Sequence, residues 1–287
     1  MTQQLRAPAA GRELPAGNLS TGTLKLIALV FMFIDHFGKV FCGNMLEMRL
    51  LGRIAFPIYA WCMVVGFTRT RNVPKYILRV FLLGVLSQPL ADLALHLNRD
   101  LGAVIASYCE PLASGFSVYG LFHTLYRIFL WGPNVLWTLA IGLAALWGIR
   151  EKKWYSHIWA PAAALLLVEL LKADYGWEGI MFMMLLYAAR NSRPAIAAVY
   201  IPFWLFMGAT SSAVSSLFGW KIQVSSLPAF IQAPVSALMR LRSFALLALP
   251  LILIPFPRDI RLPKWLSYAI YPGHLVILIL LKLLFPA

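Results

Sequence analysis

Residues 24–38 of the chain read Leu24-Lys25-Leu26-Ile27-Ala28-Leu29-Val30-Phe31-Met32-Phe33-Ile34-Asp35-His36-Phe37-Gly38. They belong to an apolar segment, 24–42, that is long enough to predict a membrane-spanning helix. Two ionisable side chains, Asp35 and His36, lie inside it. Ionisable groups in hydrocarbon are costly unless they are paired or hydrated, so they are rare there and usually functional. The pair therefore indicates a membrane protein that carries out chemistry or moves ions.

The composition of the whole chain agrees with a membrane protein. Of its 287 residues, 61% are hydrophobic and 13% are charged, and the mean hydropathy is +0.75. Soluble domains average about half apolar and about a quarter charged residues. A transmembrane β-barrel would show short segments of alternating polarity, which this sequence lacks. We therefore predict an all-α fold, a polytopic transmembrane helical bundle.

The apolar segments predict about nine transmembrane helices, within a range of about eight to eleven. These segments cover residues 24–42, 51–68, 76–95, 134–149, 157–172, 177–190, 195–217, 243–257 and 265–284. Regions 113–131 and 222–239 stay open between a span and an interfacial, re-entrant or broken segment. Residues 1–22 predict a disordered cytoplasmic tail, and residues 23–287 a single transmembrane domain.

The formal net charge of +14 predicts a membrane topology rather than nucleic-acid binding. Lys and Arg occur in small groups between apolar segments, and no long basic run or RNA-binding motif is present. With nine helices and a cytoplasmic N-terminus, 15 of the 25 Lys and Arg residues fall on the cytoplasmic side, as the positive-inside rule favours. These groups are Arg6, Arg12, Lys25, Arg69, Arg71, Lys75, Arg79, Arg150, Lys152, Lys153, Arg190, Arg193, Arg258, Arg261 and Lys264. The three cysteines form no CxxC motif and no Cys/His spacing typical of metal sites, so we expect no metal.

Asp35 and His36 are expected to contact different partners, because neighbouring side chains on a helix point about 100° apart. Arg53 begins the second apolar segment and is placed to pair with Asp35. His36 is then the freer group, and imidazole is suited to proton transfer near neutral pH. Two structural alternatives stay open. One is a polar pair that only links helices, and the other is an Arg53 side chain that extends to the membrane interface.

Other polar groups fall at the same, outer side of the predicted bundle. They comprise Gln88 and Asp92 at the end of the third segment, Asn134 before the fourth, Asp174 and Tyr175 in a glycine-containing turn, and Tyr271-Pro272-Gly273-His274 in the last segment. The Pro-Gly pair predicts an interruption of the last helix. His274 lies deep in that segment, where it can face His36. Helix capping, kinks and interhelical hydrogen bonds are the structural alternatives for these groups.

A basic connector follows the second segment. It reads Thr68-Arg69-Thr70-Arg71-Asn72-Val73-Pro74-Lys75-Tyr76, with Arg79 one turn later. On the cytoplasmic face, these side chains can receive a polyphosphate such as the one in coenzyme A. Topology and binding of anionic lipid are the alternative explanation, and no glycine-rich phosphate loop accompanies the connector.

Taken in order, the motifs resemble the TraX family of integral membrane proteins over about residues 23–285. The matching stretches are Leu24-Lys25 with Ile34-Asp35-His36, Gly52-Arg53-Ile54-Ala55-Phe56-Pro57-Ile58, Arg71-Asn72-Val73 with Tyr76 and Arg79, Ser87-Gln88, Asn134-Val135-Leu136-Trp137-Thr138, Ala173-Asp174-Tyr175-Gly176-Trp177-Glu178-Gly179 and Tyr271-Pro272-Gly273-His274-Leu275. The named member of that family acetylates the N-terminus of F-pilin, with acetyl-coenzyme A as donor.

The resemblance implies a multi-pass acyltransferase of the bacterial cytoplasmic membrane. We expect acetyl-coenzyme A to arrive at the cytoplasmic face and the acceptor, an amine or hydroxyl, to lie at the outer face. The acceptor would be a pilin-type peptide or an envelope glycan or lipid. The alternatives are a proton-coupled transporter or exporter that uses Asp35 and His36, and a non-catalytic subunit of a secretion or conjugation assembly. The oligomeric state stays open.

Each candidate residue has an expected role in acyl transfer. The catalytic set is His36 as general base, Asp35 with Arg53 as the groups that hold the site, and His274 and Asp174 as acid, base or polar wall. The substrate-binding set is Arg71, Asn72, Lys75 and Arg79 toward coenzyme A, with Gln88, Asn134, Tyr175 and Tyr271 around the reacting groups. The thioester oxyanion needs hydrogen-bond donors, for which Asn134 and Tyr271 are the candidates.

Overall fold

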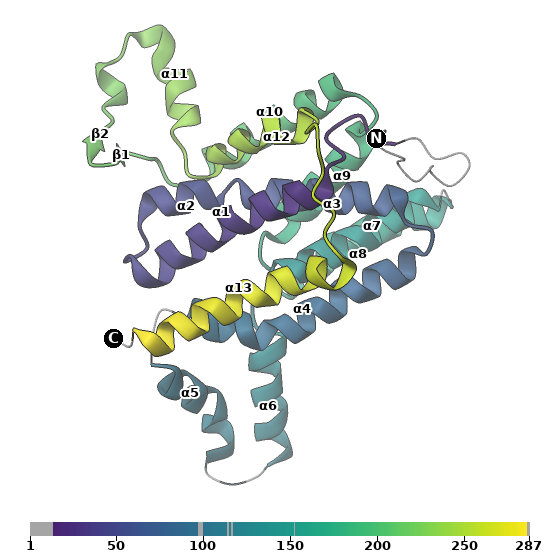
Figure 1. Cartoon of the computed structure of the whole chain (residues 1–287), viewed down its shortest axis with the longest axis vertical. Helices are drawn as coiled ribbons and strands as arrows, with labels where there is room; N and C mark the ends of the chain where they lie inside the picture. The colour runs from purple at the N-terminus through teal and green to yellow at the C-terminus, as the bar shows by residue number, and fades with distance from the viewer. Residues whose placement is uncertain (1–13, 97–99, 114, 116, 152, 286–287) are drawn as a thin grey trace.

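The protein is an all-α bundle in which long helices run side by side (Figure 1). This computed structural model describes residues 14–96, 100–113, 115, 117–151 and 153–285. In chain order the elements are α1 (Thr21–Phe41), α2 (Leu46–Gly52), α3 (Ala55–Arg69), α4 (Val73–Leu95), α5 (Leu101–Ala113), α6 (Val118–Phe129), α7 (Val135–Arg150), α8 (Trp154–Leu170), α9 (Gly176–Ala189), α10 (Arg193–Ala209), β1 (Ser216–Leu217), β2 (Trp220–Lys221), η1 (Val224–Ser226), α11 (Ala229–Leu238), η2 (Arg242–Ala248), α12 (Leu249–Leu253) and α13 (Lys264–Leu284).

The predicted all-α class is confirmed, and each predicted apolar segment contains a helix. In the described part of the chain, three helices are long and apolar enough to cross a membrane. They are Leu46–Arg69, which joins α2 and α3, Val73–Leu95 and Trp265–Leu284. Shorter apolar helices account for the other segments. The protein is thus a membrane protein by its helices, and the number of nine spans stays a prediction.

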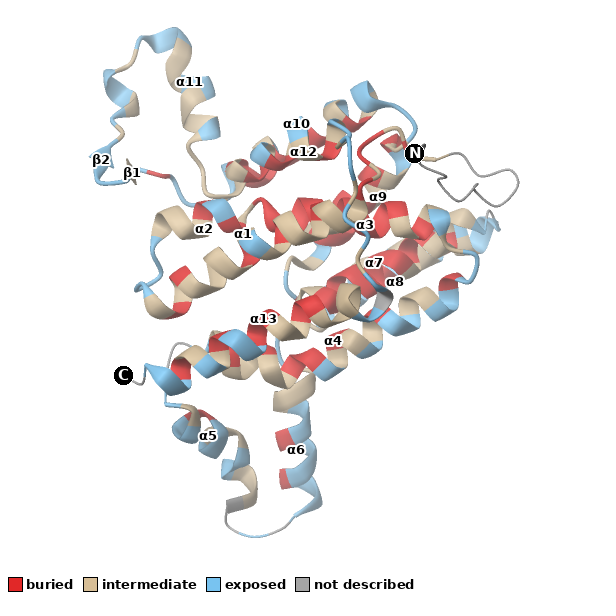
Figure 2. Cartoon of the chain, in the orientation of Figure 1, coloured by how far each residue is buried: buried red, intermediate tan, exposed pale blue. Residues whose placement is uncertain are grey.

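Helix α3 forms the centre of the bundle. Ile58, Trp61, Val64 and Phe67 are fully buried in it, and Figure 2 shows buried residues along α3 and the neighbouring α7. A helix that is apolar on all sides needs neighbours on all sides. Here α1, α7 and α9 supply them. A rigid helix at the centre positions Phe56 and Tyr59, which belong to the site described below.

Two pairs of elements project from the bundle: α5 with α6, and the β1–β2 hairpin with α11 (Figure 1). In the first pair, Thr124 Oγ1 donates to Tyr108 O at 3.1 Å. In the second, the projecting segment starts and ends at the same place on the bundle, because Arg242 N donates to Ser211 Oγ at 3.2 Å. Region 222–239 therefore does not cross the bundle, and region 113–131 contains the second helix of a helical hairpin.

The N-terminal segment is packed into the bundle from residue 14 onward. Asn18 is fully buried. Its Nδ2 donates to Leu251 O at 2.9 Å, and its carbonyl accepts from Trp61 Nε1 at 2.7 Å. This order differs from the disordered tail predicted over residues 1–22, of which residues 1–13 lie outside the described residues.

Basic residues gather at one end of the bundle, which we call the basic end. There α1 begins, α3 ends and α4 begins; Arg69 Nη2 donates to Leu19 O at 3.4 Å, and Arg193 Nε donates to Ala16 O at 3.0 Å. The residues at or near this end are Lys25, Arg69, Arg71, Lys75, Arg79, Arg150, Lys153, Arg190, Arg193, Arg258 and Arg261. They match the predicted cytoplasmic groups, of which Arg6, Arg12 and Lys152 lie outside the described residues.

Candidate active site

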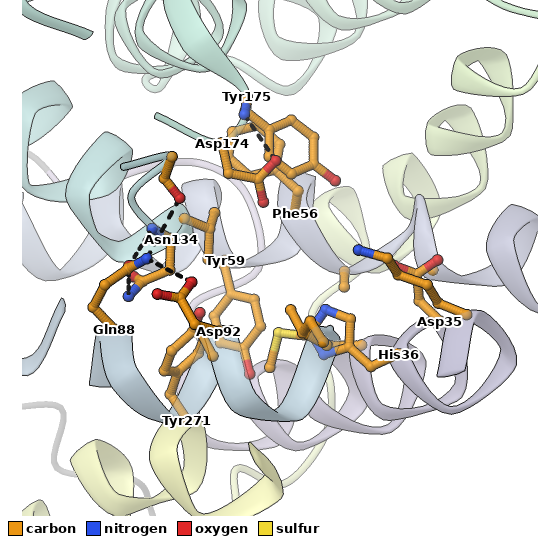
Figure 3. A pocket seen from close by; sticks show the side chains of 18 of the residues that line it. Asp35, His36, Phe56, Tyr59, Gln88, Asp92, Asn134, Asp174, Tyr175 and Tyr271 are labelled. Atoms are coloured by element: carbon orange, nitrogen blue, oxygen red, sulfur yellow. Dashed lines mark hydrogen bonds between the residues drawn. The ribbon is translucent and has the colours of Figure 1, made fainter. Parts of the chain in front are cut away.

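A cavity of about 510 Å³ opens toward the other end of the bundle, which we call the cavity end. Its walls come from α1, α2, α3, α4, α5, α13 and the connectors that precede α7 and α9 (Figure 3). Its ionisable and polar lining residues are Asp35, His36, Lys39, Arg49, Arg53, Tyr59, Gln88, Asp92, His96, Tyr108, Asn134, Lys172, Asp174, Tyr175 and Tyr271. The structure thus brings most of the predicted site residues together from six different segments.

Asp35 forms ion pairs with two arginines on the α2 side of the cavity. Its Oδ1 lies 2.7 Å from Arg49 Nε and 3.6 Å from Arg53 Nη2. The pairing predicted for Arg53 is therefore present, and Arg49 is the closer partner. Arg49 was not predicted, although it precedes Arg53 by four residues and therefore shares its helix face. Gly52 makes this approach possible, because a Cβ there would overlap the Asp35 side chain.

His36 and His274 form a pair across α1 and α13. His36 Nδ1 lies 3.1 Å from His274 Nε2, and the rings stack with centroids 5.3 Å apart. His274 is buried, with 3% of its surface exposed. The predicted break in the last helix is wrong, because α13 runs without interruption through Pro272 and Gly273. That continuity fixes His274 on the α13 face that meets α1.

The 3.1 Å contact between the two rings fits two tautomers of a neutral pair. In a neutral pair, one ring nitrogen must donate and the other accept. When His36 Nδ1–H donates to His274 Nε2, the lone pair of His36 Nε2 is free. This tautomer gives His36 the form that a general base requires.

Gln88 organises the opposite wall of the cavity. Its Oε1 accepts from Asn134 N at 2.7 Å and from Asn134 Nδ2 at 2.8 Å, and its Nε2 donates to Asp92 Oδ1 at 3.1 Å. Asn134 Nδ2 also donates to Gly84 O at 2.9 Å. Both amide hydrogens of Asn134 are thereby engaged, so its predicted role as oxyanion donor is not available in this arrangement.

Asp92 faces Asp35 and His36 across the cavity (Figure 3). Asp92 was predicted to lie at the outer side of the bundle, without a role in the reaction. The signal for it is its spacing of four residues from Gln88, which puts the two side chains on one helix face. With Asp35, Asp92 and Asp174, the cavity has carboxylates on three of its walls.

The connector before α9 forms the third wall. Tyr175 has a left-handed backbone with φ +64°, and its ring stacks on Phe56 at a centroid distance of 3.8 Å. Asp174 Oδ1 accepts from Tyr175 N at 3.1 Å, and Thr138 Oγ1 donates to Asp174 O. Desolvation by the surrounding protein raises the pKa of the Asp174 carboxyl, and the positive charge of Arg53 lowers it. A non-glycine residue held in this conformation is typical of functional sites.

The predicted phosphate-binding residues do not line this cavity. Arg71, Lys75 and Arg79 are exposed at the basic end, and Asn72 caps α4 by accepting from Lys75 N at 3.0 Å. Along α4, the stretch from Arg79 to Asp92 spans about 20 Å at 1.5 Å per residue. A donor bound by these residues must therefore reach a reacting centre that lies at the opposite end.

Several cavity residues had no predicted role. Lys39, His96, Tyr108 and Lys172 also line the cavity. Tyr108 belongs to α5, and the other three come from helix ends and connectors, where charged residues are common. Within the described residues, no group of three or more His, Cys, Asp or Glu side chains is arranged to hold a metal ion.

Comparison with known proteins identifies the family. The family described as TraX protein matches residues 20–282. A "Probable fimbrial assembly protein FimC, serogroup H1" from Dichelobacter nodosus is 28% identical over 192 residues, which cover 64% of this chain and 68% of that protein. An uncharacterised protein from Rickettsia prowazekii (strain Madrid E) is 26% identical over 121 residues, 40% of this chain and 47% of that protein. No solved structure matches. Because the family match spans the whole bundle and every wall of the cavity, the chain belongs to the TraX family.

Proposed function

We propose that the cavity is the active site of a membrane acetyltransferase that uses acetyl-coenzyme A as donor. The single observation that supports this most strongly is the His36–His274 pair at 3.1 Å in the wall of a polar cavity inside an apolar bundle. With His36 Nδ1–H as the donor of the pair, His36 Nε2 carries a free lone pair next to space for a substrate. In the proposed orientation the basic end faces the cytoplasm, as the positive-inside rule favours.

The reaction needs one proton acceptor that later returns its proton. His36 Nε2 takes a proton from the amine or hydroxyl of the acceptor as that atom bonds to the carbonyl carbon of the acetyl thioester. The carbon–sulfur bond then breaks, and the departing thiolate receives the proton from His36. Among the described residues that line the cavity there is no Ser or Cys, so direct transfer fits better than a covalent acetyl-enzyme.

Two further groups support this chemistry. Tyr271 lines the cavity beside the histidine pair, with its ring 5.3 Å from that of His274, and its hydroxyl is the remaining candidate donor to the oxyanion. Asp35, held by Arg49 and Arg53, fixes the turn of α1 from which His36 projects. Its role is positioning rather than proton transfer.

A peptide N-terminus is the acceptor that the chemistry favours. An α-amino group has a pKa of about 7.7–8.0, so a substantial fraction is neutral and nucleophilic near pH 7. Asp92 and Asp174 provide carboxylates that can orient the amine in its charged form before it reacts. The relative named as a fimbrial assembly protein makes a pilin-type peptide the first acceptor to test. An envelope glycan or lipid hydroxyl is the second.

The test compares wild type with His36→Ala in purified protein supplied with radiolabelled acetyl-coenzyme A and candidate acceptors. Loss of a general base costs about 10²–10⁴-fold in rate. The matched control is His157→Ala, which changes an exposed histidine of α8 at the basic end and should keep full activity. If wild type neither binds coenzyme A nor transfers or hydrolyses acetyl, the proposal is wrong. Proton-dependent uptake by vesicles would then favour a transporter.

A further inference from the structure

A second cavity, of about 220 Å³, lies between α3, α4, α7 and α13, and we call it the apolar chamber. Most of its lining is apolar. Its residues are Lys25, Tyr59, Met63, Tyr76, Val80, Leu83, Val135, Leu136, Leu139, Leu262, Ser267, Tyr268, Ile270 and Tyr271. Three of these, Tyr59, Val135 and Tyr271, also line the active-site cavity. A thin wall of side chains therefore separates the two spaces.

The apolar chamber extends from this wall toward the basic end. Lys25 and Leu262 belong to the first turns of α1 and to the strap before α13, and both line it. Along α4, the lining residues Tyr76, Val80 and Leu83 recur every three or four residues, so one helix face borders the chamber from the first turn of α4 to its middle. Arg79 is exposed directly beside that face. The chamber thus occupies much of the distance between the basic connector and His36.

We infer that the apolar chamber holds the phosphopantetheine arm of acetyl-coenzyme A, which rests on the proposed function. Compact ligand pockets measure about 300–1,000 Å³, so a space of this size suits a thin chain and not a nucleotide. The nucleotide stays outside, at the basic end, near Lys25, which lines the chamber, and the exposed Arg79. The thioester end of the arm then meets the wall formed by Tyr59, Val135 and Tyr271.

In that wall, Tyr59 and Tyr271 act as a gate between the chamber and the active-site cavity. Both side chains border both spaces. Tyr59 Oη lies 3.5 Å from Lys25 O, at the limit of a hydrogen bond. Tyr271 packs edge-on against the ring of His274. Movement of these two rings would connect the chamber with the site, so the acceptor and the donor would enter from opposite ends of the bundle.

The first experiment fills the chamber. Leu83→Trp places an indole in the lining, whereas Leu86→Trp, on the same helix, changes a side chain that is 72% exposed. We expect Leu83→Trp to raise KM for acetyl-coenzyme A at least tenfold and to leave KM for the acceptor unchanged. Leu86→Trp should change neither value. Thermal unfolding of each variant verifies that it is folded. A folded Leu83→Trp variant with wild-type donor KM would overturn the inference and leave the proposed function intact.

The second experiment needs no activity. Ser267→Cys introduces a thiol into the chamber, in a background with Cys42→Ser and Cys109→Ser that removes the two exposed cysteines. Desulfo-coenzyme A, which keeps the arm but has no thiol to consume the reagent, should slow labelling of this thiol by maleimide at least fivefold. Adenosine 3′,5′-bisphosphate, which lacks the arm, should not slow it.

The outcomes of labelling separate the two hypotheses. Protection by desulfo-coenzyme A in a protein that transfers no acetyl would support the chamber and reject the acetyltransferase. Transfer of acetyl without protection would reject the chamber alone. Protection by phospholipid but not by desulfo-coenzyme A would also overturn the inference, since the chamber would then be a lipid site.

Discussion

The cavity end and the basic end use the same charged residue types in opposite ways. At the cavity end, the side chain of Asp35 is 16% exposed and lies between Arg49 and Arg53. At the basic end, Arg71 and Lys75 are exposed on a connector and a helix start. Buried charges depend on their partners, whereas exposed charges contribute little to stability and much to topology. The site is therefore the region where one substitution should affect folding and function together.

Of the substitutions that test this contrast, Asp35→Ala should have the largest effect on stability. It leaves two guanidinium groups without their carboxylate, and we expect a loss of about 2–4 kcal/mol, close to what is lost when one partner of a buried pair is removed. Arg71→Ala should change stability by less than about 0.5 kcal/mol. Thermal or denaturant unfolding in detergent measures both. Equal effects of the two substitutions would show that the cavity-end charges are not interdependent.

Gly52→Ala tests the contact that allows this ion pair. The added Cβ would overlap the Asp35 side chain, so we expect a loss of about 1–3 kcal/mol, as for overpacking in a core. The matched control is Gly273→Ala on α13, where a Cβ would meet open space in the described part of the structure. That change should be neutral or stabilise the helix by up to about 1 kcal/mol. A tolerated Gly52→Ala with full activity would show that Asp35 is free to move.

Substitutions of Gln88 and Asn72 compare two amide side chains, one at the cavity end and one at the basic end. Gln88→Leu removes the acceptor of the buried Asn134 N–H, which should cost about 1–3 kcal/mol. Asn72→Ala removes an exposed helix cap and should cost about 1 kcal/mol. Only Gln88→Leu should also lower the acetyl-transfer rate, because Gln88 orients Asp92. Unfolding and initial-rate measurements on both variants decide this.

Much of the fold follows from the sequence because a long apolar segment in lipid satisfies its backbone hydrogen bonds by forming a helix. Segments such as 76–95 predict helices that the structure contains as α4 and its counterparts. Residues 14–20 were predicted to belong to a disordered tail but are packed against the bundle. Asn18 forms hydrogen bonds with Leu251 and Trp61, which lie far away in the chain. The continuity of α13 through Pro272 was missed because packing, and not local propensity, holds that helix together.

The site was predictable where a polar residue interrupts an apolar segment. Such interruptions single out His36, His274 and Gln88, which all lie at or beside the cavity. They do not reveal the details of pairing. Arg49 competes for Asp35 only because the chain reverses between α1 and α2. Asn134 loses its predicted role because its amide hydrogens are engaged by Gly84 and Gln88, contacts that depend on the packing of α4 against α7.

The double substitution Lys75→Ala with Arg79→Ala should have the smallest effect and tests the basic end itself. Each side chain is exposed, and contacts of exposed charges are worth about 0.2–1 kcal/mol. We therefore expect KM for acetyl-coenzyme A to rise about three- to tenfold, without a change in stability or in KM for the acceptor. S-acetylpantetheine has no nucleotide, so its KM should not change. An equal increase for both donors would mean that these residues act on the bundle rather than on the phosphates. The basic end would then stabilise the bundle, as the charges at the cavity end do.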